Sequence, residues 1–319
     1  MAKNFSLDFL VSLLLIPQGE GFFASKHPIC ESISKGVMPS MKPAQLMNRL
    51  TPLLPFLQCP RCSSPFHGTE QSLVCENSHC YDLSRRGYVN LAPSHDQSGE
   101  KYDAALFESR RAVLEGGYYQ PVLDAVCSLL PSEKPFLLLD VGCGEGYYAR
   151  LIAETFEQAQ VIGLDLSRDA ITAAARVPSR ANWLVADLKH LPVADHAADV
   201  VLDVLTPADY EAFRRVLKPD GTLIKVIPGA DYLTEVRKAV SPWLRSGAEY
   251  DNSRVMDHLR AHADLLGETE IRLTMPVTED ISRAFLRMTP MTFSIPEETL
   301  NALSISEITI HMHVMQCRL

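Results

Sequence analysis

A glycine-rich loop directly after a short apolar segment is the feature that most constrains the fold of this chain. The apolar segment Phe136–Val141 runs into Gly-Cys-Gly-Glu-Gly at residues 142–146. A continuous apolar run of this length that ends in glycines is typical of a buried parallel strand. The glycines allow a tight turn and the close approach of a ligand to the backbone. In an open α/β sheet, ligands bind at this carboxyl end of the strands.

The segments around this loop alternate between extended and helical patterns. Extended patterns cover Phe136–Val141, Val161–Leu164, Asn182–Ala186, Asp199–Leu205 and Thr222–Ile227, and helical patterns cover residues 104–115, 120–130, 147–156, 169–177 and 207–217. Strands that alternate with helices of about ten residues predict a doubly wound parallel sheet, so we expect an α/β, Rossmann-like fold. Ser167 is the candidate cap of one helix, and residues 218–221 form an expected turn. The alternating segment Glu307–Gln316 predicts a half-buried strand at the sheet edge.

The spacing within the loop favours S-adenosylmethionine over a dinucleotide as the ligand. Dinucleotide-binding loops follow Gly-x-Gly-x-x-Gly, which seats a pyrophosphate at the start of a helix. Here the spacing is Gly142-x-Gly144-x-Gly146, and Glu145 would repel a pyrophosphate. The amino-acid tail and the sulfonium of S-adenosylmethionine suit an acidic loop better. We therefore expect Gly142 and Gly144 to contact this cofactor.

Three aspartates complete the expected cofactor site. Asp140 precedes the loop, Asp165 ends the second strand, and Asp187 follows the third. The Asp165 carboxylate can accept both ribose hydroxyls, and Asp187 is placed for the adenine amino group. The alternatives are a strand-end hydrogen bonder for Asp140 and a turn cap for Asp187. The combined pattern predicts a class I S-adenosylmethionine-dependent methyltransferase.

A cluster of cysteines predicts a metal site. Of the eight cysteines, Cys59, Cys62, Cys75 and Cys80 fall within 22 residues, and His79 lies beside the last of them. Such clustering indicates metal binding rather than a disulfide framework. The Cys-x2-Cys and Cys-x3-His corners suit a closed, tetrahedral structural Zn²⁺ site, in which His79 and Cys80 compete for the fourth position. A domain this small depends on its metal to fold.

We expect four parts along the chain: an extension of residues 1–46, a zinc-binding domain of residues 47–93, a helical linker of residues 94–131 and a methyltransferase domain of residues 132–319. We expect a start codon placed too early to account for the extension, with Met41 or Met47 as the true start; the alternative is a signal peptide, which Lys3 ahead of an apolar run resembles. Its apolar run Phe9–Ile16 is shorter than the roughly 20 residues that span a bilayer. A thiolate metal site suits a reducing compartment. The sequence therefore predicts a cytoplasmic protein with no membrane partner.

The overall charge limits the kind of nucleic acid that this protein can bind. The formal net charge is −9 and the pI is about 5.6, whereas non-specific affinity comes from phosphate neutralisation by Lys and Arg. We therefore expect no DNA partner, and an RNA partner only through local recognition. The candidates to bind RNA phosphates are Arg85, Arg86, Arg110 and Arg111, which are otherwise ordinary solvated charges.

From Cys59 to its end, the sequence resembles the bacterial 23S rRNA (guanine-N1-)-methyltransferase family, in which an N-terminal zinc domain is joined to a Rossmann-like methyltransferase domain. The segments that carry the resemblance are the Cys59–His79 pattern, Arg86-Gly87-Tyr88-Val89-Asn90-Leu91, Arg110-Arg111-Ala112, Gly117-Tyr118-Tyr119-Gln120-Pro121, residues 140–148 and Met288-Thr289-Pro290. The fusion of a zinc domain to this glycine loop makes the resemblance specific.

The resemblance implies a site, a reaction and partners. It implies zinc ligands at Cys59, Cys62, Cys75 and His79, and cofactor contacts at Tyr119, Tyr148, Ala149 and near Tyr232. At this last position another polar residue, such as histidine, is expected. The implied partners are 23S rRNA and a second copy of the chain in a homodimer. The implied reaction is methyl transfer to N1 of a guanine in a domain II hairpin, of the position-745 type. The alternatives are a neighbouring guanine of the position-748 type, a small-molecule methyltransferase and a non-enzymatic RNA-binding protein.

The implied chemistry needs the sulfonium methyl group and N1 to be held about 3 Å apart. N1 of guanine carries a proton, so an acceptor for that proton would help. Asp203 and Thr206 lie at the predicted end of the fourth strand, although Asp203 is equally placed to be buried structure, and water is the alternative acceptor. No catalytic residue is identified from the sequence. His311 and His313 share a strand face with no third ligand expected nearby, so we interpret them as surface or core histidines.

Overall fold

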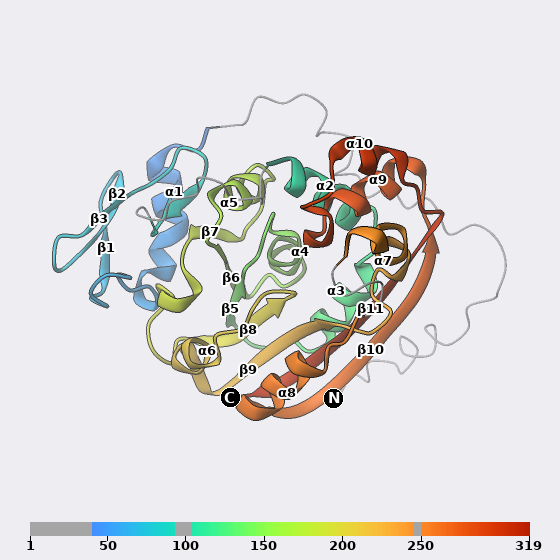
Figure 1. Cartoon of the computed structure of the whole chain (residues 1–319). Coiled ribbons are helices and arrows are strands. Elements are labelled where there is room, and N and C mark those ends of the chain that lie inside the picture. The colour runs from blue at the N-terminus through green and yellow to red at the C-terminus, as the bar shows by residue number, and fades with distance from the viewer. Residues whose placement is uncertain (1–39, 93–103, 245–249) are drawn as a thin grey trace, which may run out of the picture. The chain divides into compact units, whose positions relative to one another are not determined.

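The strand predicted before the glycine loop lies in the middle of an eight-stranded sheet (Figure 1). The computed structural model describes residues 40–92, 104–244 and 250–319; residues 1–39 of the expected extension and residues 94–103 of the expected linker lie outside the described residues. The strand order is β10-β11-β9-β8-β5-β6-β7-β4. The strands from β9 to β4 are parallel, and β11 and β10 are added antiparallel. This order confirms the predicted α/β, Rossmann-like class.

The strands and helices predicted from the sequence are present with small shifts at their ends. The strands of the large sheet are β4 (Tyr88–Asn90), β5 (Phe136–Val141), β6 (Ala159–Asp165), β7 (Asn182–Val185), β8 (Ala198–Val204), β9 (Leu217–Pro228), β10 (Asp264–Pro276) and β11 (Glu307–Arg318). The expected turn at residues 218–221 instead lies within β9, at a bulge where the pairing with β8 shifts.

The helices of this part lie before, between and after the strands. They are α2 (Ala104–Glu115), α3 (Gln120–Ser128), α4 (Tyr147–Thr155), α5 (Arg168–Ala175), α6 (Tyr210–Val216), α7 (Thr234–Val240), α8 (Ser253–His262), α9 (Glu279–Arg287) and α10 (Glu297–Ala302), with short 3-10 helices η3 (Leu188–His190), η4 (Ser241–Trp243) and η5 (Pro290–Thr292). Ser167 caps α5 as predicted, since its side chain accepts a hydrogen bond from Ala170 N at 3.2 Å. None of the described helices is long and apolar enough to cross a membrane.

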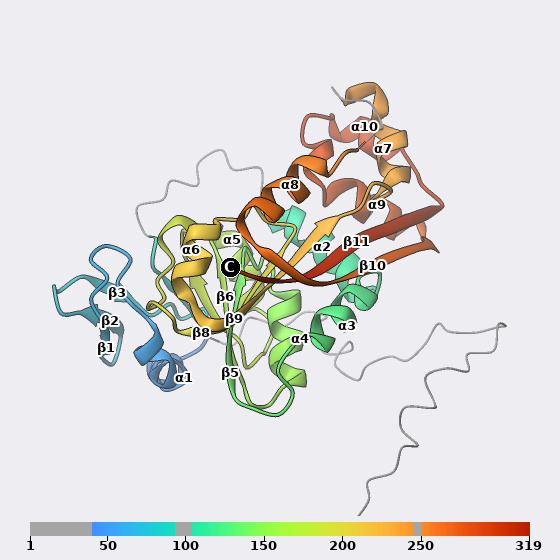
Figure 2. The same ribbon diagram turned by 90° about the horizontal axis from the view of Figure 1, so that it is seen from below.

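Side chains of the central strands alternate between two hydrophobic cores, one on each face of the sheet. Leu138 and Leu202 belong to the core to which α3, α4, α5, α7 and α9 contribute, whereas Leu137 and Leu139 belong to the core to which α1, α6 and α8 contribute. Figure 2 shows α4 and α6 on opposite sides of the sheet. Because successive side chains of a strand point to opposite faces, β5 is buried throughout. This burial is the reason that all of its residues except Asp140 are apolar.

The cysteine-rich segment is built onto one edge of this sheet. It comprises α1 (Pro43–Leu50), η2 (Thr51–Phe56) and a three-stranded antiparallel sheet of β1 (Phe66–Gly68), β2 (Ser72–Cys75) and β3 (Cys80–Asp82). We call residues 57–91, which follow the two helices, the ribbon. The strand β4, which follows, pairs in parallel with β7, with Tyr88 opposite Trp183. Leu57 forms a further bridge with Val193. Helix α1 crosses the boundary expected at residue 47, and its Leu46 is buried.

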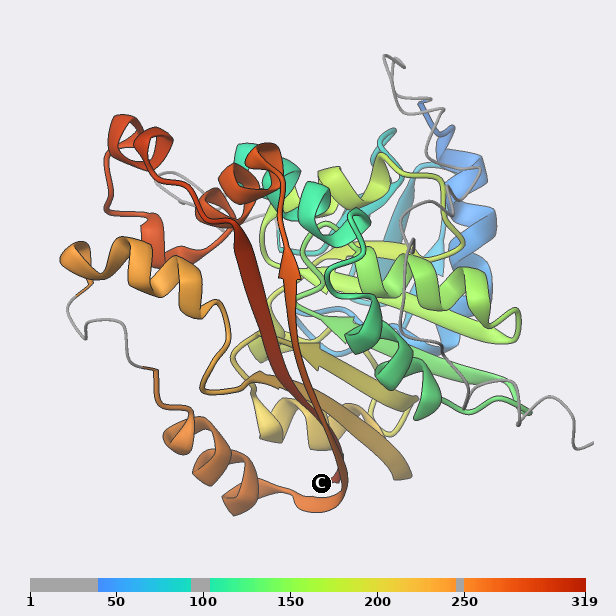
Figure 3. The ribbon, with the colours of Figure 1, turned by 90° about the vertical axis from the view of Figure 1, so that its right-hand side faces the viewer.

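The outer strands of the sheet differ from the prediction. β11, expected at the edge, lies between β9 and β10, with Ile310 opposite Leu273 of β10. Figure 3 shows β10 and β11 side by side along their length. Both faces of β11 are buried, as Ile308 on one face and Met315 on the other show. The edge on this side is β10, which the sequence analysis did not predict; Ile271, Leu273 and Met275 alternate with polar residues in it, and most of its side chains are exposed.

Candidate functional site

The glycine loop connects β5 to α4 at the carboxyl edge of the parallel strands. Gly142, Gly144 and Gly146 have φ angles of +69°, +56° and +79°, a left-handed conformation that favours glycine. Space is limited as well, because a Cβ atom on Gly142 would lie 2.4 Å from Thr206 Oγ1, and one on Gly146 would lie 2.4 Å from the Trp183 ring. Glycine is therefore required at these positions both by the backbone conformation and by the neighbouring side chains.

We expect Gly142→Ala to weaken S-adenosylhomocysteine binding by about tenfold or more, with a stability loss of about 1–3 kcal/mol. The added methyl group would collide with Thr206, and alanine is strained at this φ. Isothermal titration calorimetry and thermal unfolding measure the two effects. Gly267→Ala on β10 is the matched control, because nothing lies within 4 Å of its Cβ position. Equal losses in the two variants would contradict the prediction.

The loop is surrounded by carboxylates. Asp140 is buried and accepts a hydrogen bond from Ala149 N at 3.2 Å. Burial, with smaller contributions from Asp165 and Asp203, raises the pKa of Asp140 to about 8. Burial also raises the pKa of Glu145. Because a buried carboxylate regains its charge beside a cation, this environment favours a positively charged ligand such as an ammonium or a sulfonium.

Two more of the predicted aspartates lie at the ends of β6 and β7. Asp165 Oδ2 accepts a hydrogen bond from Gly144 N at 2.9 Å, and its Oδ1 accepts one from Ser167 N at 2.8 Å. These bonds fix the carboxylate beside the glycine loop. Asp187 Oδ1 accepts a hydrogen bond from Lys189 N at 3.0 Å and caps η3. Asp187 thus has the capping role that the sequence left open, and its contact with adenine stays a prediction.

Tyrosine hydroxyls form the next part of the site. Tyr119 at the start of α3 and Tyr232 before α7 share a hydrogen bond of 2.7 Å between their hydroxyls. Tyr148 is 7% exposed, and within the described residues its buried hydroxyl has no hydrogen-bond partner. A buried polar group without a partner costs about 1–3 kcal/mol. A ligand that offers this hydroxyl a hydrogen-bond partner would remove that cost. Tyr118, in contrast, packs in the core against Phe285.

Asp203, considered from the sequence as an acceptor for the N1 proton, is engaged in a buried ion pair. Its side chain is 0% exposed, and Lys225 Nζ lies 2.7 Å from its Oδ2. Lys225 Nζ also donates to the Thr206 carbonyl at 2.6 Å, and Asp203 Oδ1 accepts from Thr206 N at 3.3 Å. The pair anchors the segment after β8, where Leu205 has a φ of +58°. Asp203 therefore has the structural role, not that of a base facing a substrate.

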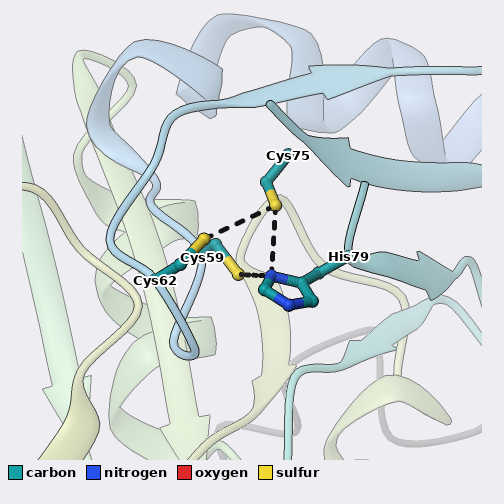
Figure 4. A group of neighbouring side chains, drawn as sticks. All are labelled: Cys59, Cys62, Cys75 and His79. Atoms are coloured by element: carbon teal, nitrogen blue, oxygen red, sulfur yellow. Dashed lines mark hydrogen bonds between the residues drawn. The ribbon is translucent and has the colours of Figure 1, made fainter. Parts of the chain in front are cut away.

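The four predicted zinc ligands converge in the ribbon. The ligand atoms of Cys59, Cys62, Cys75 and His79 all lie within 4.8 Å of one another (Figure 4). The Sγ atoms of Cys62 and Cys75 are 3.6 Å apart, and His79 Nδ1 lies 3.5 Å from Cys59 Sγ and 3.4 Å from Cys75 Sγ. A tetrahedral zinc ion with Zn–S bonds of about 2.3 Å separates its ligands by similar distances. The donor set therefore fits structural zinc.

The direction of the side chains separates His79 from its rival Cys80. Cys80 is exposed and lies outside the group, whereas His79 points into it. Local hydrogen bonds also favour the thiolate form of one ligand, Cys62. A bond from the Asn77 side chain and others from Ser64 lower the pKa of Cys62 to about 5. The thiolate is the form of cysteine that binds metals.

A second group of possible metal ligands lies on β10 and β11. Glu270 stands beside His311 and His313, so the expectation that no third ligand is nearby was wrong; that ligand comes from the unpredicted strand. His311 Nδ1 accepts a hydrogen bond from Asp231 N at 3.1 Å, which leaves the proton on Nε2, 2.9 Å from Glu270 Oε1. A protonated Nε2 does not bind a metal. This group is therefore explained as a hydrogen-bond network.

The four candidate phosphate-binding arginines fall into two groups. Arg85 and Arg86 are exposed between β3 and β4. Arg111 donates a hydrogen bond to the Ala173 carbonyl at 2.7 Å, and Arg110 lies beside Gly144 in the glycine loop. Of the four, Arg85 and Arg86 are therefore the ones free to bind RNA phosphates.

Comparison with known proteins finds matches for both the ribbon and the large sheet. A methyltransferase domain model matches residues 138–221, and a zinc-ribbon model described as RlmA, N-terminal, matches residues 57–99. YxjB of Bacillus subtilis (strain 168), provisionally named a 23S rRNA (guanine-N1-)-methyltransferase, is 33% identical over 274 residues, which cover 81% of this chain and 95% of the relative. The 23S rRNA (guanine(748)-N1)-methyltransferase of Streptomyces fradiae is 30% identical over 274 residues, which cover 82% and 96%.

The domain model that spans the glycine loop and its flanking strands places the chain among methyltransferases. The zinc-ribbon match ahead of it narrows the class to methyltransferases that carry a zinc-binding N-terminal domain. The two relatives align over more residues than the methyltransferase part alone contains. The chain therefore belongs to the family of 23S rRNA (guanine-N1-)-methyltransferases, which confirms the resemblance seen in the sequence.

Proposed function

We propose that this protein transfers the methyl group of S-adenosylmethionine to N1 of a guanine in a domain II hairpin of 23S rRNA. The observation that carries the proposal is the fused architecture, since relatives named for this reaction align across both the ribbon and the sheet. The proposed target is a guanine of the position-745 type. The name of the Streptomyces fradiae relative supports the neighbouring guanine 748 as the second candidate.

We propose that the cofactor is held over the glycine loop, where it supplies an electrophilic methyl group. The residues that would hold it are Tyr119, Asp140, Gly142, Gly144, Tyr148, Ala149, Asp165, Asp187 and Tyr232. The acidic surroundings of the loop and the unpartnered Tyr148 hydroxyl support this placement. The burial of Asp203 against Lys225 supports solvent, rather than this carboxylate, as the acceptor of the N1 proton.

The ribbon has a structural role in this proposal. Cys59, Cys62, Cys75 and His79 would hold one Zn²⁺ ion, and four protein ligands leave no open position for chemistry. The exposed Arg85 and Arg86 at the end of the ribbon would contact RNA phosphates and position the hairpin without reading its sequence. A homodimer and a cytoplasmic location stay predictions.

Transfer of radioactive methyl groups tests the proposal. The full-length, zinc-loaded protein is incubated with labelled S-adenosylmethionine and 23S rRNA from a strain that lacks the modification. We expect label in 23S rRNA and none in 16S rRNA or in a metabolite extract. Label in the metabolite extract alone, from a protein that binds S-adenosylhomocysteine, would reject an rRNA substrate in favour of a small-molecule one.

A further inference from the structure

Arg110 lies directly over the glycine loop. It projects from α2, one helical turn after the buried Phe107. A Cβ atom built on Gly144 would lie 3.9 Å from Arg110 Nη1 and 4.0 Å from Phe107 Cε1. The two side chains therefore cover the same point of the loop, and α2 is held there by its packing against α4, α5 and α9.

The guanidinium of Arg110 is surrounded by acidic groups but is not paired with them. Burial lowers its pKa, and the Glu145 carboxylate, Tyr232, Asp165 and Tyr119 raise it by more, so the group stays charged. Nevertheless, Arg110 makes no hydrogen bond and no ion pair with any described residue, whereas its neighbour Arg111 donates to Ala173. A guanidinium has five N–H donors. Those of Arg110 are left for a group that enters the space above the loop.

The chemistry of the proposed cofactor identifies that group. S-adenosylmethionine carries a sulfonium and an ammonium, which suit the buried carboxylates of Asp140 and Glu145. Its single anionic group is the carboxylate of the methionine moiety. Arg110 is the cation whose guanidinium faces Gly144, and arginine binds carboxylates through paired N–H donors.

We propose that Arg110 binds the methionine carboxylate of S-adenosylmethionine and so fixes the end of the cofactor that carries the transferred methyl group. This inference rests on the proposed function, because it requires S-adenosylmethionine as the cofactor. It also changes the role that the sequence analysis gave to Arg110, from a contact with RNA to a contact with the cofactor.

The test compares two ligands that differ only in this carboxylate. Isothermal titration calorimetry on the full-length zinc protein measures the Kd of S-adenosylhomocysteine and of decarboxylated S-adenosylhomocysteine, which keeps the amine. We expect Arg110→Met to weaken the first ligand by about 10- to 100-fold, the usual value of hydrogen bonds to a charged group. The Kd of the decarboxylated ligand should change by less than about threefold.

Arg111→Met is the matched control, because it removes a neighbouring guanidinium that is already bonded to Ala173. We expect it to leave the ratio of the two Kd values as in the unchanged protein, and Arg110→Lys to restore part of the discrimination. Equal weakening of both ligands by Arg110→Met, or a loss of rRNA binding with the Kd of S-adenosylhomocysteine unchanged, would overturn the assignment. If the unchanged protein binds neither ligand, the proposed function itself fails, which is a distinguishable result.

Discussion

Replacing Cys75 with serine is expected to remove zinc from this protein and to cost several kcal/mol of folding stability. Structural zinc contributes an apparent ~10–16 kcal/mol to isolated zinc fingers, and a typical domain is stable by only about 5–15 kcal/mol. The loss should spread beyond the ribbon, since Cys75 lies in the core that also contains Leu139 of β5. Metal analysis by mass spectrometry should find no zinc, and thermal unfolding should show a Tm lower by roughly 10 °C or more.

The neighbouring thiol provides the control for this prediction. Cys80 is exposed and adjacent in sequence to the proposed ligand His79, but it lies outside the four-residue group. We expect Cys80→Ser to keep its zinc and its Tm. Loss of zinc from Cys80→Ser would show that Cys80, rather than His79, is the fourth ligand, and retention of zinc by Cys75→Ser would contradict the site itself.

The second large effect is expected at the buried ion pair below the glycine loop. Lys225→Met should destabilise the protein by about 3–5 kcal/mol, because it leaves the Asp203 carboxylate buried without its partner. Burial raises the pKa of Asp203 from 3.8 to about 6 even with Lys225 present. A carboxyl whose pKa is higher in the folded than in the unfolded protein stabilises the fold when it is protonated. The contribution of the Asp203 carboxyl to folding stability is therefore complete below about pH 4 and is lost as the pH rises through about 6. Without Lys225 the pKa rises further, so the damage should be greater at pH 8 than at pH 5. Urea unfolding at the two pH values measures both effects.

A half-exposed ion pair on the same strands is the matched control. Lys218 Nζ lies 2.8 Å from Asp199 Oδ1, with 37% of the lysine side chain exposed. We expect Lys218→Met to cost no more than ~1 kcal/mol. The double variant Asp203→Asn/Lys225→Met should recover part of the loss, because no buried charge remains. A Lys225→Met protein whose stability does not depend on pH would contradict this account of Asp203.

The centre of the fold was predictable because local and tertiary requirements agree there. β5 is apolar since both of its faces are buried, and its glycines have the φ angles that the loop needs. In the outer strands the local sequence and the tertiary environment agree less well. Most side chains of β10 are exposed, including that of Leu273. One face of β11 buries Thr309 and His311, whose polar atoms bond to Glu235 and Glu270. A buried strand with polar residues therefore had the alternating sequence of an edge strand.

The site was predictable to the extent that its chemistry lies in short motifs. The four predicted zinc ligands are closely spaced, and the structure brings them together as expected. The joining of β4 to β7 was not predictable, because it pairs residues that are far apart in the sequence without a recognisable pattern. The Asp203–Lys225 pair and the place of Arg110 over Gly144 were missed for the same reason. A buried lysine that faces an aspartate of the preceding strand is visible only once the two strands are aligned.

Primer extension along 23S rRNA methylated by the purified full-length protein tests the central claim most directly. A methyl group on N1 of guanine blocks Watson–Crick pairing and therefore stops reverse transcriptase. We predict a single new stop at a guanine of the domain II hairpin, at position 745 or 748, and a much weaker stop with the Gly142→Ala protein. Incorporation of label into 23S rRNA without a stop, or with a stop outside this hairpin, would contradict the account.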